Sequence, residues 1–154
     1  MLLPVWFAVP PAGVWLHLMV AVESSAFTQL HFTGPRWMRD VGNGPRLTDI
    51  AITNPEHPLA AGLTGSVRVL VRPQRTRWAA PPATATPVAG YTGGALDHGA
   101  LVFAYDRGDF TADGRAPARR AGLFLGNDRI VRSLNEQGWR LFDAAVSWCA
   151  ADAR

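Results

Sequence analysis

The arrangement of apolar and polar residues in the last third of the chain predicts a strand, a turn and a helix. Residues 121–125 are apolar, and Gly-Asn-Asp at 126–128 ends this run, as expected for a short buried strand followed by a turn. Asn135 is a good N-cap, and Glu136 places negative charge in the first helical turn. An apolar stripe with the helical period follows, and it consists of Leu141, Phe142, Ala145, Val146 and Cys149. This closing unit indicates a layered α/β domain.

Short strands separated by turns are predicted for the rest of the chain. Two continuous apolar runs predict strands buried on both faces, two alternating segments predict half-exposed strands, and one short segment is a further candidate. The continuous runs are 18–22 and 100–105, the alternating segments are 47–53 and 66–71, and the short candidate is 86–91. Within the second alternating segment, Val67, Val69 and Val71 should share one face.

The segments between the strands carry turn and loop residues. Proline follows both Asn54 and His57, which predicts a rigid turn at 54–58. Single helical turns are expected at 26–30 and 59–63. Because few helices separate the strands, we expect a mixed sheet rather than a purely parallel one. Loops rich in glycine and proline are predicted at 42–45, 73–87 and 106–117.

Composition and charge indicate one globular domain and do not favour a nucleic-acid partner. The 154 residues are 48% hydrophobic and 18% charged, with a formal net charge of +3. Every basic residue is arginine, and the densest group is Arg68, Arg72, Arg75 and Arg77, next to Trp78. Nucleic-acid binding calls for a concentrated basic stripe with stacking aromatics. We therefore interpret these arginines as a solvated edge.

The apolar N-terminal segment resembles neither a signal peptide nor a membrane span. Arg36 is the first basic residue, and Pro10, Pro11 and Gly13 interrupt the apolar run. A signal peptide has a basic start and an unbroken apolar core, and a span needs about 20 continuous apolar residues. We expect this segment to form a buried strand and a turn, and we expect no membrane partner. The sequence does not indicate a compartment. The domain organisation is predicted as an atypical segment at 1–17 and a single α/β domain at 18–154.

Three motifs in a fixed order resemble the class I glutamine amidotransferase-like superfamily, nearest to its ThuA-like (trehalose-utilisation) domains. The first is I-T-N-P-E-H-P-L-A-A-G-L at 52–63, the second is Gly108-Asp109 beyond an apolar strand, and the third is the closing segment 117–148. The resemblance implies a flavodoxin-like α/β fold. Domains of this family open with several strand–helix units, which residues 1–17 lack, so the resemblance also implies an incomplete, N-terminally truncated domain. An incomplete sheet would favour self-association or association with other domains.

The sequence lacks the motifs of the expected catalytic chemistry. Glutamine amidotransferases place a nucleophilic cysteine in a G-x-C-x-G elbow, whereas Cys149 lies on a helical apolar stripe, where a cysteine ordinarily packs in the core. No G-x-S-x-G motif is present. Asp97 and His98 are adjacent, and adjacent side chains usually point apart. The four histidines, His17, His31, His57 and His98, lack metal-ligand spacing, so we expect no metal, no cofactor and no catalytic residue.

A small polar or carbohydrate ligand is the candidate partner for the polar residues that follow the predicted strands. In open α/β sheets, ligands bind beyond the carboxyl ends of strands, and polar residues there would share one rim if the strands are parallel neighbours. The candidate ligand-binding residues at this rim are Glu23, Ser24, Asp106, Arg107, Asn127 and Asp128, and His57 and His98 are further candidates outside the rim. The alternative is that these are solvated loop residues and helix caps, and that His57 orients its turn by bonding to backbone.

Three functions remain open at the level of the sequence. The leading prediction is a non-catalytic accessory or ligand-binding domain. The first alternative is a ThuA-like hydrolase of a sugar derivative that acts through His57, His98 or Asp106. It would require a second carboxylate, from Glu23 or Asp128, to lie close to Asp106. The second alternative is a fragment without independent activity.

Overall fold

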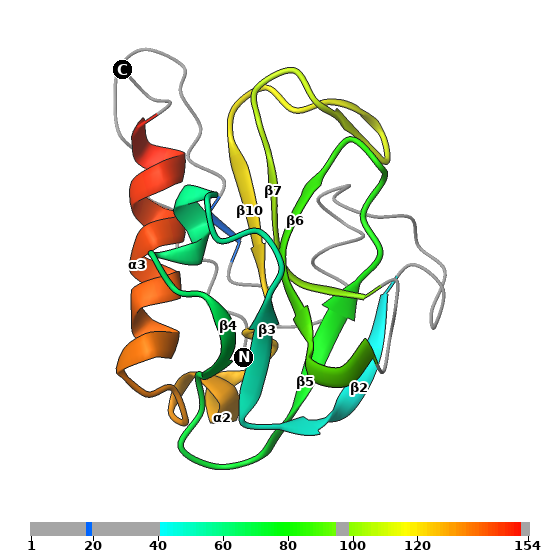
Figure 1. Cartoon of the computed structure of the whole chain (residues 1–154). Coiled ribbons are helices and arrows are strands. Elements are labelled where there is room, and N and C mark those ends of the chain that lie inside the picture. Colours follow the sequence, from blue (N-terminus) through cyan, green and yellow to red (C-terminus); the bar gives the residue numbers. More distant parts are fainter. Residues whose placement is uncertain (1–17, 20–40, 95–98, 152–154) are drawn as a thin grey trace.

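The computed structural model describes residues 18–19, 41–94 and 99–151. Within these ranges it contains ten strands, two α-helices and two short 3-10 helices, which are labelled η (Figure 1). The elements are β1 (Leu18–Met19), β2 (Val41–Leu47), β3 (Asp49–Ile52), η1 (Pro58–Ala60), β4 (Gly65–Arg68), β5 (Gln74–Ala79), β6 (Thr86–Tyr91), η2 (Thr92–Gly94), β7 (Ala100–Tyr105), β8 (Phe110–Thr111), β9 (Gly114–Arg115), β10 (Arg120–Leu123), α2 (Asp128–Val131) and α3 (Glu136–Ala151). The expected strand end at 20–22, the helical turn at 26–30 and segment 1–17 lie outside the described residues.

The main sheet is mainly antiparallel. Its strand order is β1-β10-β7-β6-β3-β4, and β5 pairs with both β7 and β2. In the described residues, β1 and β10 form a parallel pair, and the other pairs are antiparallel. This confirms an α/β domain with a mixed sheet. A flavodoxin-like sheet is mostly parallel, so the pairing does not confirm that finer assignment.

Strand β7 is the centre of the sheet. All six of its residues are buried. Leu101 and Ala104 belong to one apolar cluster, whereas Phe103 and Tyr105 belong to a second cluster. Because a strand covered on both faces needs apolar residues at every position, the continuous run 100–105 correctly predicts this strand.

Helix α3 packs along one side of the sheet, against η1, β10 and β4 (Figure 1). Asn135 caps it as predicted, because its Oδ1 accepts a hydrogen bond from the Gly138 N–H at 3.0 Å. Cys149 is buried in the apolar cluster, also as predicted. Trp148 is buried there as well. Within the described residues, no helix is both long and apolar enough to span a membrane.

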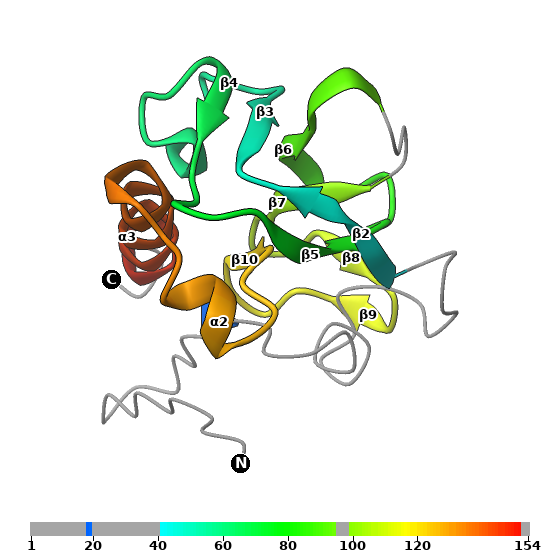
Figure 2. The ribbon, with the colours of Figure 1, turned by 90° about the horizontal axis from the view of Figure 1, so that it is seen from below.

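Strands β2 and β5 lie where the sequence predicts loops. Strand β2 is on the side of the structure away from α3, and β5 lies between them (Figure 2). The register of β2 against β5 shifts between Asn43 and Arg46. This shift leaves Gly44 and Pro45 opposite Thr76, which is a β-bulge. A proline that would break a regular ladder is tolerated at a bulge, so the Gly-Asn-Gly-Pro sequence is strand rather than loop.

Three further sequence predictions differ from the structure. Val71 does not share a buried face with Val69, because β4 ends at Arg68 and the Val71 side chain is 61% exposed. The chain leaves the sheet there, since the Val71 N–H donates to the Ser133 carbonyl at 2.7 Å. The predicted loop 106–117 contains the small β8–β9 hairpin. Segment 47–53 is two strands, because β2 ends at Leu47 and β3 begins at Asp49.

Candidate functional site

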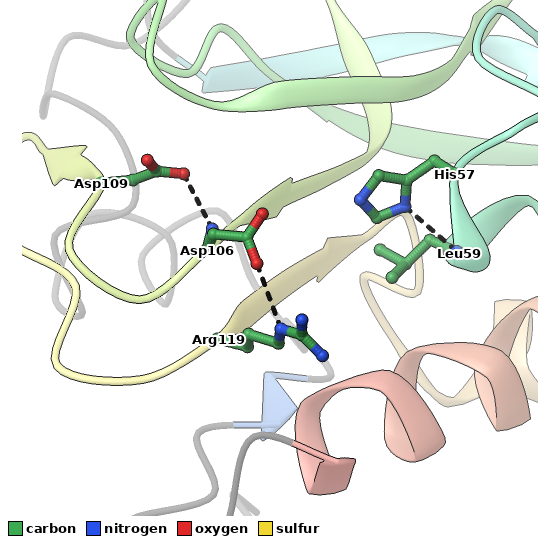
Figure 3. Close-up of polar contacts among 5 residues, drawn as sticks. All are labelled: His57, Leu59, Asp106, Asp109 and Arg119. Atoms are coloured by element: carbon green, nitrogen blue, oxygen red, sulfur yellow. Dashed lines mark hydrogen bonds and ion pairs between the residues drawn. The ribbon is translucent and has the colours of Figure 1, made fainter.

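The sheet topology brings His57, Asp106 and Arg119 to one edge. Strands β3 and β7 are both antiparallel to β6, which lies between them, so β3 and β7 run in the same direction. The turn with His57 follows β3, and Asp106 follows β7. Strand β10 is antiparallel to β7, which places Arg119, just before β10, at the same edge. Figure 3 shows these three side chains together.

His57 is held by the turn that the sequence predicts. It is the N-cap of η1, and its Nδ1 accepts a hydrogen bond from the Leu59 N–H at 3.1 Å. Pro58, at the first position of η1, has a fixed φ that suits a helix start. With Nδ1 used as an acceptor, the proton of the neutral ring lies on Nε2. That nitrogen points towards Asp106 and Arg119 (Figure 3).

The environment of His57 favours the neutral form of its ring. Burial is the largest influence and lowers the pKa of His57 below its usual 6.5; the Asp106 carboxylate raises the pKa, and the Arg119 guanidinium lowers it. The ring also lies 5.2 Å from the Trp148 ring, between centroids. A neutral imidazole with a bound Nδ1 presents one donor, the Nε2–H.

Asp106 and Arg119 form an ion pair beside His57. The Arg119 Nε lies 3.1 Å from the Asp106 Oδ1, and the guanidinium carbon lies 4.9 Å from the centroid of the Trp148 ring. The Asp109 Oδ2 accepts a hydrogen bond from the Asp106 N–H at 2.8 Å. The Asp106 side chain is 61% exposed. Asp109 therefore holds the Asp106 backbone and Arg119 holds its carboxylate, while the carboxylate remains accessible to a ligand.

The predicted single rim of polar residues does not form. Because β10 is antiparallel to β7, Asn127 and Asp128 lie at the opposite edge from Asp106. Asn127 caps α2 by accepting from the Ile130 N–H at 3.1 Å, and the Asp128 Oδ2 lies 3.9 Å from the Arg132 Nε. Asn127 and Asp128 are thus a helix cap and a surface ion pair, and Asp128 cannot serve as the second carboxylate beside Asp106.

The other predicted site residues are only partly placed. Arg107 is exposed and follows Asp106, whereas Glu23, Ser24 and His98 lie outside the described residues. Arg119 and Trp148 were missed by the sequence interpretation. Trp148 follows Leu141 and Ala145 at helical spacing, which could have revealed its inward orientation. Arg119 has no comparable signal, because its place depends on the antiparallel pairing of β10.

Comparison of the chain with protein-family models, with curated proteins and with solved structures gives no match. The family resemblance therefore depends on the sequence motifs alone. Among the described residues, no group of three or more His, Cys, Asp or Glu side chains is arranged to hold a metal ion. The arrangement that remains is a histidine donor beside an ion pair.

Proposed function

We propose that this chain is a non-catalytic, ThuA-like member of the glutamine amidotransferase-like superfamily, acting as an accessory or ligand-binding domain. Its site would be the cluster of His57, Asp106 and Arg119, and its ligand a small polar molecule of the carbohydrate type. The observation that carries the proposal is the convergence of these three side chains from separate segments. Each of the three residues makes a further contact: the His57 ring with the Leu59 N–H, the Asp106 backbone N–H with Asp109, and the Arg119 guanidinium with the Trp148 ring.

The charge of the cluster suits an uncharged polar ligand. The negative Asp106 and the positive Arg119 compensate each other, and burial favours the neutral form of His57. A carboxylate accepts hydrogen bonds, whereas a guanidinium and an Nε2–H donate them. Hydroxyl groups both donate and accept, so adjacent hydroxyls of one ligand could bond to both kinds of group at once.

The tautomer of His57 favours binding over base catalysis. A general base needs an unprotonated nitrogen within reach of the proton that it removes. The available lone pair of His57, on Nδ1, accepts from the Leu59 N–H, and the nitrogen that faces the cluster carries the proton. His57 therefore donates a hydrogen bond to whatever binds beside Asp106.

Ligand titration with matched variants tests this proposal. Neutral monosaccharides, disaccharides and polyols would be titrated into the full chain, with chemical-shift changes followed by NMR. The Oδ1 of asparagine and the Nδ1 of histidine are the same number of bonds from Cβ, and both accept hydrogen bonds. His57→Asn should therefore keep the η1 cap and lose only the Nε2–H donor. We expect His57→Asn and Asp106→Asn to fold and to weaken binding, while Asp128→Asn, at the opposite edge, leaves it unchanged. No saturable shift with any of these ligands would refute the proposal.

A hydrolase of a sugar derivative is the second candidate, because the structure brings His57 and Asp106 to the same edge. Chromogenic glycosides and esters provide the assay. Turnover that Asp106→Ala abolishes, in a variant that keeps the wild-type circular dichroism, would favour this candidate over a binding domain. The pairing of Asp106 with Glu23 falls outside the described residues and is tested by Glu23→Gln in the same assay.

Two further parts of the proposal concern the whole chain. The flavodoxin-like assignment requires parallel strands beyond the pairings described, and an experimental structure that includes residues 20–40 would test it. An incomplete sheet predicts self-association or association with other domains, which light scattering after size-exclusion chromatography would reveal. If the chain is a fragment without independent activity, circular dichroism should show no cooperative melting of the isolated 154 residues.

A further inference from the structure

Three exposed arginines lie in or next to the connection between β4 and β5: Arg46 in β2, Arg72 in the connection and Arg75 in β5. Arg46 lies directly opposite Arg75 in the β2–β5 ladder. Side chains at such positions share one face, with Cβ atoms about 4.5–5.5 Å apart, and like charges there are destabilising. Within the described part of the chain, none of the three forms an ion pair with a carboxylate. The fold thus places like charges together without an acidic partner.

Backbone contacts hold this arrangement in place. The Arg46 Nη2 donates to the Pro73 carbonyl at 2.9 Å, which directs its guanidinium to the start of β5. The Arg72 N–H donates to the Ser133 Oγ at 3.1 Å, and that hydroxyl donates to the Arg72 carbonyl at 3.3 Å. Because a guanidinium has five N–H donors, Arg46 keeps free donors after bonding to Pro73.

We propose that Arg46 and Arg75, with Arg72 in the connection that leads into β5, bind an oxyanion of the phosphate type. The guanidinium fork matches the geometry of such a group, and one doubly charged anion would offset the repulsion between the paired arginines. The ligand is a phosphate group, either free or as part of a larger molecule. This site is separate from the His57 cluster, since the connection that holds Arg72 lies beside α2 (Figure 1), which follows β10 at the opposite edge from Asp106.

Titration with inorganic phosphate tests the site. At constant ionic strength, phosphate should produce saturable NMR shifts in β2 and β5. Arg46→Gln and Arg75→Gln should each raise the dissociation constant about tenfold, the effect of losing one charge-assisted contact. Arg129→Gln is the matched control, because it removes one exposed arginine from α2 at the same end of the structure and should change the dissociation constant little. Equal weakening by all three variants would indicate a net-charge effect and overturn the proposal.

A second titration identifies the source of the phosphate group. A short single-stranded oligonucleotide replaces inorganic phosphate in the same assay. Binding of the oligonucleotide that depends on Arg46 and Arg75 would assign the site to a phosphodiester chain, whereas binding of inorganic phosphate alone would assign it to a free anion or a small phosphate ester. Binding of neither probe would refute the site, and it would leave the carbohydrate-type site at His57 unaffected.

Discussion

Replacing Gly44 by alanine should destabilise the fold strongly, because Tyr91 fills the space that the new methyl group would occupy. A Cβ built on Gly44 lies 1.8 Å from the Tyr91 Oη and 2.4 Å from its Cζ, whereas ordinary contacts begin at 3.4 Å. The Tyr91 side chain is buried and its hydroxyl bonds to the Thr76 hydroxyl at 3.0 Å. Overpacking of this kind costs about 1–3 kcal/mol, and loss of the buried hydrogen bond costs about 1 kcal/mol more. We therefore expect Gly44→Ala to lower the free energy of unfolding by about 2–4 kcal/mol.

Urea denaturation followed by tryptophan fluorescence measures this change, and melting should show a Tm lower by roughly 4–16 °C. Gly90→Ala is the matched control, since the nearest atom to its Cβ is the Gly99 carbonyl oxygen at 3.6 Å, and its effect should stay within about 1 kcal/mol. Tyr91→Phe removes the hydroxyl that the new methyl group would meet. The double variant should therefore lose about 1 kcal/mol less stability than the sum of the two single variants. If Gly44→Ala is as stable as Gly90→Ala, the placement of Tyr91 over the β2 bulge is wrong.

Three further changes test the site and the helix. Because folding lowers the pKa of His57 below 6.5, the unfolded chain binds more protons than the folded chain, and stability should fall as the pH drops through 6.5 and below. His57→Asn should reduce this pH dependence in urea titrations. An unchanged pH dependence in that variant would contradict the prediction. Asn135→Ala removes the α3 cap and should cost about 1–2 kcal/mol in the same assay, while Asn135→Asp should retain most of that stability. Cys149→Ser buries a hydroxyl and should cost about 1–3 kcal/mol; rapid modification of the native Cys149 thiol by a thiol reagent would show that it is not buried.

The elements that the sequence predicts well are those whose pattern has one interpretation. The run 100–105 is long, continuous and apolar, and it forms the buried strand β7. Helix α3 combines a cap with a stripe of helical period; the cap is found, and Leu141, Ala145 and Cys149 of the stripe are buried, whereas Phe142 and Val146 are half-buried. By contrast, β2 contains two glycines and a proline within five residues. A residue pattern does not distinguish a loop from a bulged strand, because the bulge depends on Thr76 and Tyr91, which come later in the chain.

The candidate site shows the same distinction between local and distant information. The role of His57 in its own turn is local: Pro58 follows it, and its Nδ1 accepts from Leu59 two residues away. Its neighbours Asp106 and Arg119 arrive through strand direction, which no residue near His57 specifies. Strands β3 and β7 are not neighbours, but they run in the same direction because two antiparallel pairings through β6 restore it. The assumption of parallel neighbours is wrong for β7 and β10, which pair antiparallel. That pairing places Asp128 at the opposite edge and brings Arg119 to the edge of His57 and Asp106.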